Sequence, residues 1–257
     1  MAGQASLSRS GHVAEIRFSK PPHNFVDPDL LRQIADAVES CDADPEVRAI
    51  VLLSEGKSFC AGADLAGDEN ITGESGMDAI GGLYEQAIRL FSRKKPIVAA
   101  IQGAAVGAGL GLAVAADFRV ASPAARFSAN FVRLGFHPGF GLTHTLPRLI
   151  GVQRAQWMML SSERVKAEDA FSWGLVDRMA APETLLEEAH RMAAEIAENA
   201  PLALNATRAT LVGSLVDDVI KTLRHEHAMQ SMLKTTADYE EGVASVFKRR
   251  PANFIGR

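Results

Sequence analysis

The chain of 257 residues has little cysteine and no excess of positive charge. Its two cysteines, Cys41 and Cys60, show no spacing that indicates a disulfide framework or a zinc site. The formal net charge is -4, so we expect no overall attraction to nucleic acid or to a membrane surface. An anionic ligand would therefore have to be bound by local positive charge.

Long uninterrupted apolar runs are also missing. The first 13 residues have no apolar segment typical of a secretory signal. Residues 97–116 are mostly apolar, but Gln102 and four glycines interrupt them, which favours buried core over a membrane span. Apolar residues make up 47% and charged residues 23% of the chain, as in ordinary globular proteins. We therefore expect a cytoplasmic protein with one large domain or one domain and an appendage.

Strand and helix patterns alternate in the first half of the chain and give way to helices in the second. Alternation in 12–19 predicts a half-buried strand, and the apolar runs 49–53 and 96–103 predict buried strands. Asp27 and Pro28 predict the start of a helix. Further helices are expected over the ranges 77–95, 184–200, 216–233 and 238–250. This order predicts a mixed α/β core followed by a helical C-terminal section.

Two glycine-rich segments, 58–64 (SFCAGAD) and 102–111 (QGAAVGAGLG), each follow a predicted buried strand. Ligands of α/β sheets gather beyond the carboxyl ends of the strands, where backbone N–H groups can point at an anion. Two converging amides would form an oxyanion hole. Close packing of two turns explains the same glycines equally well. The second segment is not a dinucleotide fingerprint, because it lacks the third glycine at the required offset.

Several motifs in order along the chain resemble the enoyl-CoA hydratase/isomerase (crotonase) superfamily. They are FCAGADL, KKPIVAAIQGAAVGAGLGLAVAADFRVAS, ARFSANFVRLGFHPGFGLTHTLPRLIG, AFSWGLVDRM and EGVASVFKRRPANF, and they cover about residues 7 to 254. The resemblance implies a spiral core of ββα turns at 1–195 and a helical trimerisation region at 196–257. It further implies an enzyme that binds an acyl-CoA thioester, as a homotrimer or a dimer of trimers, with no cofactor beyond the CoA and no metal.

The resemblance also implies roles for particular residues. The backbone amides of Ala63 and Ala108 would form the oxyanion hole. The CoA would lie along Ala61, Ala63, Asp64 and Leu65. Arg249 would approach a CoA phosphate, although a solvated basic helix end explains this arginine nearly as well. The residues expected to line the acyl pocket are aromatic: Tyr84, Phe131, Phe136 and Phe140.

The sequence departs from the family at its acid and base positions. Hydratases of the family use two glutamates, and the matching positions here are Gly111 and Phe131. A third acidic position used by some isomerases matches Gly139, and a histidine used by a dehalogenase-like branch matches Tyr84. Loss of a general acid or base costs about 10²- to 10⁴-fold in rate, so we expect inefficient hydration.

His137 lies next to the lost acid positions and could serve as a base. A turn histidine bonded to a backbone carbonyl is the alternative. Two further alternatives concern the whole protein. It could be a true hydratase that takes its acid and base from elsewhere, for example residues 66–78, or a non-catalytic acyl-CoA-binding homologue.

Overall fold

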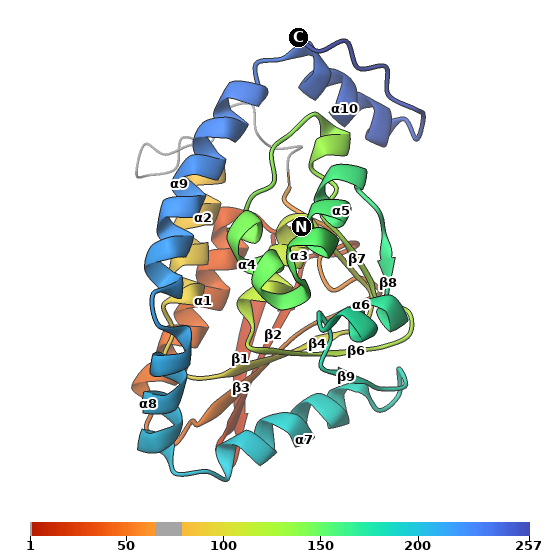
Figure 1. Ribbon diagram of the computed structural model, residues 1–257. Helices are drawn as coiled ribbons and strands as arrows, with labels where there is room; N and C mark the ends of the chain where they lie inside the picture. The colour runs from red at the N-terminus through yellow and green to blue at the C-terminus, as the bar shows by residue number, and fades with distance from the viewer. Residues whose placement is uncertain (1, 65–78) are drawn as a thin grey trace.

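Six strands form the main sheet of the computed structural model, which describes residues 2–64 and 79–257 (Figure 1). Their order across the sheet is β1-β2-β3-β4-β6-β9. Strands β1 and β2 are antiparallel and the remaining neighbours are parallel. The strands are β1 (Gln4–Ser10), β2 (Val13–Ser19), β3 (Ala49–Ser54), β4 (Ile97–Ile101), β6 (Phe118–Ala121) and β9 (Arg178–Met179).

A smaller sheet stands beside the first and carries the second glycine-rich segment. It has the order β5-β7-β8, with β5 (Ala104–Val106) parallel to β7 (Arg126–Ser128) and β8 (Val165–Lys166) antiparallel to β7. Because β4 ends at Ile101 and β5 begins at Ala104, the chain passes from one sheet to the other within a few residues. This switch places the segment 102–111 where the chain passes from the main sheet to the smaller one.

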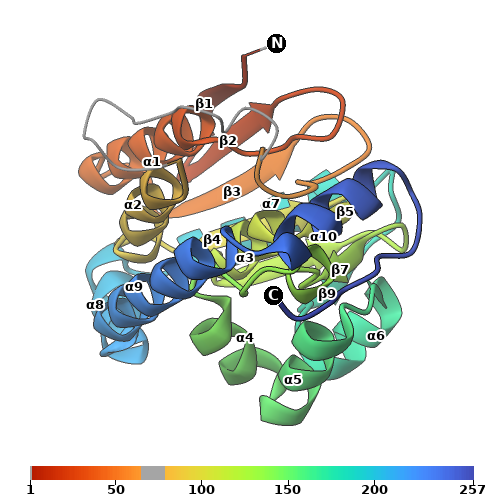
Figure 2. The same ribbon diagram turned by 90° about the horizontal axis from the view of Figure 1, so that it is seen from above.

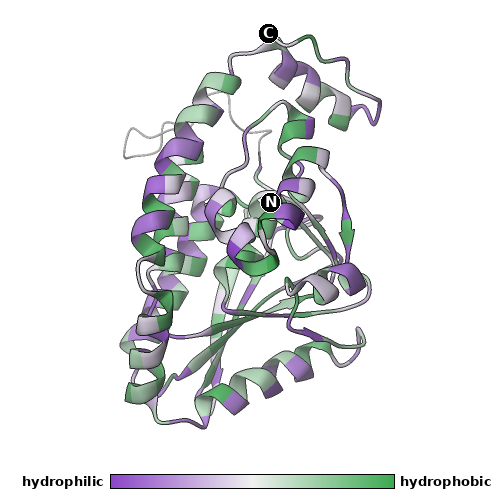
Figure 3. Cartoon of the chain, in the orientation of Figure 1, coloured by the Kyte–Doolittle hydropathy of each residue, from purple (hydrophilic) through white to green (hydrophobic). Residues whose placement is uncertain are grey.

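Strand β3 is buried on both faces, as its apolar sequence predicts. Ile50 and Leu52 belong to the large core cluster on the side of α1 and α2. Val51 and Leu53 belong to a second cluster, which packs against helix α7. The sheet is therefore a middle layer between two helical layers, and Figure 3 shows apolar strands between helices with mixed faces.

The helices are α1 (Pro28–Ala43), α2 (Ala79–Phe91), α3 (Ala108–Ala115), α4 (Leu142–Ile150), α5 (Val152–Ser161), α6 (Ala167–Trp173), α7 (Leu185–Ala197), α8 (Pro201–Val212), α9 (Leu215–Leu233) and α10 (Ala237–Phe247), with a 3₁₀ turn η1 (Val132–Leu134). Helix α1 begins as expected: the Asp27 side chain accepts a hydrogen bond from the Leu30 amide, and Pro28 is the first helical residue. Figure 2 shows α1, α2 and α9 side by side, in agreement with the contacts of α2 with both other helices.

Mixed α/β structure followed by helices is confirmed, and the residues after Ala197 form only helices and loops. The boundary at 195/196 falls within α7, and the division into two units stays a prediction. Strand β1 and helices α5, α6 and α8 were not expected from the sequence. The helix expected at 77–95 ends at Phe91. Among the described residues, no helix combines the length and apolarity that crossing a bilayer requires.

Candidate active site

The two glycine-rich segments lie side by side. Cys60 and Ala105 form a parallel bridge, in which the Cys60 amide donates to the Ala104 carbonyl (2.9 Å) and the Val106 amide donates to the Cys60 carbonyl (3.0 Å). Gly109 has to be a glycine, because a β-carbon there would overlap the Cys60 carbonyl group. The close packing weighed from the sequence is therefore present, and it brings the two candidate amides onto neighbouring turns.

The N–H of Ala63 points away from Val26, with which the segment around Ala63 forms a parallel bridge. Its neighbours make that contact: the Val26 amide donates to the Gly62 carbonyl and the Asp64 amide donates to the Val26 carbonyl, each at 2.9 Å. In a parallel bridge of this kind, the N–H of Ala63 points to the other side. Within the part of the chain that the structure describes, this N–H has no acceptor.

Ala108 is the first residue of α3 and follows an unusual turn. Gly107 has φ 55° and ψ -118°, a conformation that glycine adopts and L-residues avoid. The Gly111 amide returns to the Gly107 carbonyl at 3.0 Å, which closes the first helical turn. Among residues 2–64 and 79–257, no acceptor faces the Ala108 N–H, and the positive end of the helix dipole adds to its donor strength.

Aromatic side chains occupy the neighbourhood of the two positions that lack glutamate. A β-carbon at Gly111 would lie 2.5 Å from both Cβ and Cγ of Phe140, so the Phe140 ring fills the space beside this glycine. Phe140 is 1% exposed and has φ 62°. Phe131, at the other position, is buried, and its ring edge lies 3.8 Å from the site of a β-carbon on Gly107. These contacts make the surroundings of the second turn apolar.

Tyr84 occupies the space beside the third acidic position of the family. A β-carbon at Gly139 would overlap the Tyr84 hydroxyl group. This hydroxyl donates to Oε1 of Gln230 at 2.6 Å, and Nε2 of Gln230 donates to the His137 carbonyl at 2.8 Å. The bonds join α2, α9 and the turn before α4, three segments distant in sequence.

His137 forms a hydrogen bond to a backbone carbonyl, the alternative that the sequence allows for a turn histidine. Its Nδ1 lies 2.7 Å from the Pro138 oxygen and donates to it, because a carbonyl oxygen can only accept. The ring lies edge-on to His225, with the ring centroids 5.9 Å apart. Phe136 is buried and packs on Tyr239, with their centroids 5.1 Å apart.

The structure describes the residues expected to contact the CoA, apart from Leu65. The Ala61 amide donates to the His23 carbonyl at 3.1 Å. Asp64 is exposed, and its carboxylate forms an ion pair with Nζ of Lys20 at 2.8 Å. The same nitrogen also pairs with the carboxylate of Asp27 at 2.5 Å. Arg249 lies after α10, exposed, with φ 51°. Leu65 and the alternative acid/base segment 66–78 lie outside the described residues.

Neither cysteine is suited to nucleophilic chemistry. Cys60 lies in the first turn, but complete burial raises the pKa of its thiol to about 12. Burial likewise raises the pKa of the Cys41 thiol to about 11. Both thiols therefore stay protonated at neutral pH and act as small apolar groups. In the described part of the chain, no cluster of three or more histidine, cysteine or carboxylate side chains is arranged to hold a metal.

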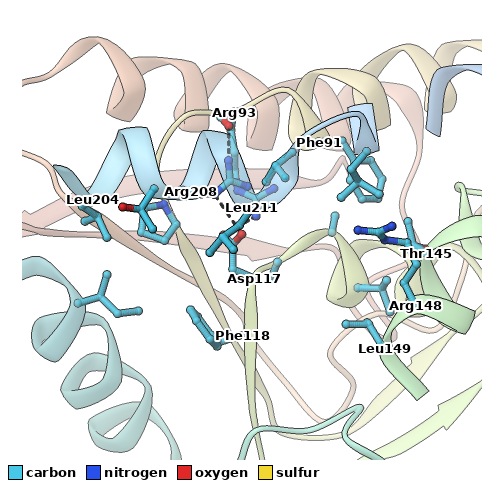
Figure 4. Close-up of a pocket in the computed structure, with 18 of the residues that line it drawn as sticks. Phe91, Arg93, Asp117, Phe118, Thr145, Arg148, Leu149, Leu204, Arg208 and Leu211 are labelled. Carbon is cyan, nitrogen blue, oxygen red and sulfur yellow. Dashed lines mark hydrogen bonds and ion pairs between the residues drawn. The ribbon is translucent and has the colours of Figure 1, made fainter. Parts of the chain in front are cut away.

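A cavity of about 750 Å³ lies at the other end of α3, lined by Val114, Ala115 and side chains of α4, α7 and α8. Asp117 stands in it between two arginines, with Arg93 Nη2 at 2.6 Å and Arg208 Nε at 3.0 Å (Figure 4). Because α3 has eight residues and rises about 1.5 Å per residue, the cavity and the Ala108 amide are about 10 Å apart along the helix axis. The cavity is thus separate from the paired turns.

The arrangement is that of an α/β protein in which two glycine-rich turns lie side by side beyond the strands of the core. The model of the enoyl-CoA hydratase/isomerase family matches residues 8–257, and the chain belongs to this family. It is 34% identical over 256 residues to a crotonyl-CoA hydratase of Syntrophomonas wolfei, covering 98% of this chain and 97% of the relative. It is 36% identical over 249 residues to a putative enoyl-CoA hydratase of Thermus thermophilus, covering 95% and 98%.

Solved structures agree with this assignment. An enoyl-CoA hydratase/isomerase of Pseudoalteromonas atlantica superposes with a TM-score of 0.88 at 27% identity, covering 98% of this chain and 99% of that one. An enoyl-CoA hydratase of Mycobacterium avium subsp. paratuberculosis gives 0.86 at 26% identity, covering 98% of each chain. The crotonase fold expected from the sequence motifs is confirmed.

Proposed function

We propose that this enzyme binds an acyl-CoA thioester and stabilises the enolate or tetrahedral anion formed from it with the backbone amides of Ala63 and Ala108. One observation carries the proposal: two N–H groups without an acceptor in the described part of the chain lie on turns that the Cys60–Ala105 bridge holds together. Preorganised donors of this kind are strongest where charge develops in the transition state.

The surroundings favour chemistry that depends on anion stabilisation more than on water. The positions of the family glutamates are Gly111 and Phe131, and the Phe140 ring lies against the first of them. An apolar neighbourhood strengthens the hydrogen bonds to an anion and gives a water nucleophile little to bind. Isomerisation and decarboxylation pass through such an anion without a water nucleophile, so both fit this site better than efficient hydration does. Thioester hydrolysis also passes through an anion, but it needs a bound water.

Hydration is the second candidate, because the relatives named above are called hydratases. It would take its acid and base from residues 66–78. The non-catalytic homologue remains the third. His137 is the candidate base among the described residues, with Nε2 as the nitrogen that would accept a proton.

Two measurements separate these candidates. The first is exchange of α-protons of a saturated acyl-CoA in D₂O, followed by mass spectrometry, which reports enolate formation whatever the overall reaction is. The second is the loss of conjugated absorbance of crotonyl-CoA. Exchange with negligible hydration supports the proposal. Hydration at ordinary enzyme rates, about 1 to 10³ s⁻¹, would establish the second candidate. Binding with neither exchange, hydration nor release of free CoA thiol would establish the third. Exchange that survives in His137→Ala would remove this histidine from the site.

The CoA contacts of Ala61, Asp64, Leu65 and Arg249 and the acyl-pocket roles of Tyr84, Phe131, Phe136 and Phe140 belong to the same proposal. Support for Arg249 comes from its exposure at the end of α10. A phosphate contact predicts that Arg249→Ala weakens CoA binding more than it weakens binding of 3′-dephospho-CoA. Equal losses for both ligands would assign the arginine elsewhere.

We also propose that the cavity beside α3 is covered by a second copy of the chain, in a homotrimer or a dimer of trimers. Leu202 and Leu211 on α8 are 85% and 77% exposed, and Leu211 lines the cavity. Exposed leucines at the mouth of an apolar cavity are typical of subunit contacts. Light scattering should give three or six times 27.5 kDa, and Leu211→Asp should shift the mass toward one chain. A monomeric wild-type protein would contradict the proposal.

A further inference from the structure

We propose that the carboxamide of Asn130 donates a third hydrogen bond to the thioester oxygen that Ala63 and Ala108 bind. The inference deepens the proposed function and rests on it. Asn130 stands directly before Phe131, in the connection between β7 and η1. It would be a catalytic residue, because its side chain would touch the reacting oxygen.

Sheet register places Asn130 beside the second turn. Strands β5 and β7 are parallel, with Ala104 opposite Arg126 and Val106 opposite Ser128. The pairing reaches one residue further, because the Gly107 amide donates to the Ser128 carbonyl at 2.9 Å. Asn130 follows Ser128 by two residues, so this bond places Asn130 near the turn at Gly107.

The side chain confirms this proximity. Oδ1 of Asn130 lies 3.4 Å from the place of a β-carbon on Gly107, in van der Waals range of this turn. Gly107 carries no side chain, so nothing of its own stands between the carboxamide and the turn. Rotation about the Cβ–Cγ bond of Asn130 exchanges its oxygen and its NH₂ group, so the donor end can face the same place.

The carboxamide of Asn130 is also available. The residue is half-buried, and its side chain has no hydrogen-bond partner in residues 2–64 and 79–257. Asn24, by contrast, is buried, and both ends of its carboxamide are hydrogen-bonded. Its Oδ1 accepts from the Lys20 amide, and its Nδ2 donates to the carbonyls of Glu55 and Ser58. A polar group that is half-buried beside an unpaired backbone donor is suited to share a ligand with it.

Chemistry favours an anionic oxygen as the shared ligand. An enolate or tetrahedral oxyanion has three lone pairs, and the two backbone amides use two of them. A neutral carboxamide cannot take up a proton at physiological pH, but it can donate to the third lone pair. The rings of Phe131 and Phe140 lower the local polarity, which strengthens this bond. Asn130 would thus contribute to stabilising the anion while proton transfer is done elsewhere.

Acetoacetyl-CoA tests the inference without knowledge of the physiological substrate. Its enolate has a near-ultraviolet absorbance of its own, which reports the anion bound in the hole. The S-butyl thioether of CoA, which has no carbonyl oxygen, serves as the matched ligand. The variants are Asn130→Ala, Asn130→Asp, and the control Asn205→Ala on α8, a half-buried asparagine distant from the turns in the sequence.

Asn130→Ala should weaken enolate binding by about 10- to 100-fold, the range for a hydrogen bond to a charged group, and Asn130→Asp should weaken it further by repulsion. Thioether binding should change by less than about 2-fold in both variants, which also verifies their folding. Asn205→Ala should behave as wild type. Equal losses for both ligands, or no loss in Asn130→Ala, would overturn the role of Asn130. Absence of the enolate signal in wild-type protein would instead overturn the oxyanion hole itself.

Discussion

The ring of Phe140 lies against the backbone of Gly111, so that a β-carbon on this glycine would be 2.5 Å from Phe140 Cβ. The two residues therefore form a coupled pair: the glycine makes room for the ring, and the ring fills the space beside position 111. A glutamate cannot be restored at 111 by a single substitution.

Coupling between these residues predicts a non-additive effect on stability. Gly111→Ala should lower the free energy of unfolding by about 1–3 kcal/mol, because it overpacks the contact. In a Phe140→Gly background, which removes the Cβ as well as the ring, the same substitution should cost nothing or stabilise, since alanine is the better helix former by about 1 kcal/mol. Urea unfolding of the four proteins in the cycle measures this, and additive costs would show that the ring does not restrict position 111.

Ala108→Pro should remove the second oxyanion donor without breaking a bond of the fold. Proline is tolerated at the first position of a helix, where its missing N–H has no helical partner. We expect α-proton exchange to fall by about 10²- to 10³-fold, with little change in the melting temperature. Val152→Pro, at the first position of α5, is the matched control and should retain wild-type exchange. Comparable exchange in both variants would argue against the Ala108 amide.

Glu226 should make the stability of the protein depend on pH. Burial raises the pKa of its carboxyl to about 7, although donors from Thr143 and Gly141 favour the charged form. The ordinary pKa of a glutamate carboxyl is 4.5, so unfolding releases a proton between about pH 4.5 and 7. The free energy of unfolding therefore falls as the pH rises through this window, by up to about 3 kcal/mol. Above about pH 7 the contribution of Glu226 no longer changes with pH.

Glu226→Gln should flatten this dependence, because an amide does not titrate in that range. Chemical denaturation at half-unit steps from pH 5 to 8 measures the slope. The exposed Glu198→Gln variant should keep the wild-type slope. A wild-type slope in Glu226→Gln would assign the pH dependence to other groups.

Asp117→Asn should be costly, because it leaves the buried guanidinium groups of Arg93 and Arg208 without a counter-charge. Burial alone would raise the pKa of Asp117, but the two arginines and the Ile97 amide keep it below its ordinary value. We expect a loss of about 3–5 kcal/mol in unfolding free energy. Because the folded pKa is lowered, the contribution of Asp117 is present above the unfolded pKa and is lost as the pH falls through the folded one. A loss below about 1 kcal/mol would show that solvent replaces the carboxylate.

Local sequence determined the elements that carry the candidate site. Asp27 and Pro28 began a helix, apolar runs formed β3 and β4, and the glycines of 102–111 formed the turn that starts α3. These features depend on neighbours in the chain, through capping, periodicity and backbone freedom, so they can be predicted from it. Strand β1 was missed because its residues are mostly exposed and only Ala5 and Leu7 are apolar. Helices α5 and α8 were missed because several of their apolar side chains face outward.

By itself, the sequence determined that two glycine-rich turns follow buried strands, and that glycine and phenylalanine stand at 111 and 131, the positions that the family resemblance matches to glutamates. Only the tertiary structure decided what fills the vacated space and which polar groups face it. The Phe140 ring against Gly111, the Tyr84 hydroxyl beside Gly139 and the Asn130 carboxamide beside Gly107 are all contacts between segments far apart in the chain. Such contacts follow from strand register and helix packing, which no local pattern encodes.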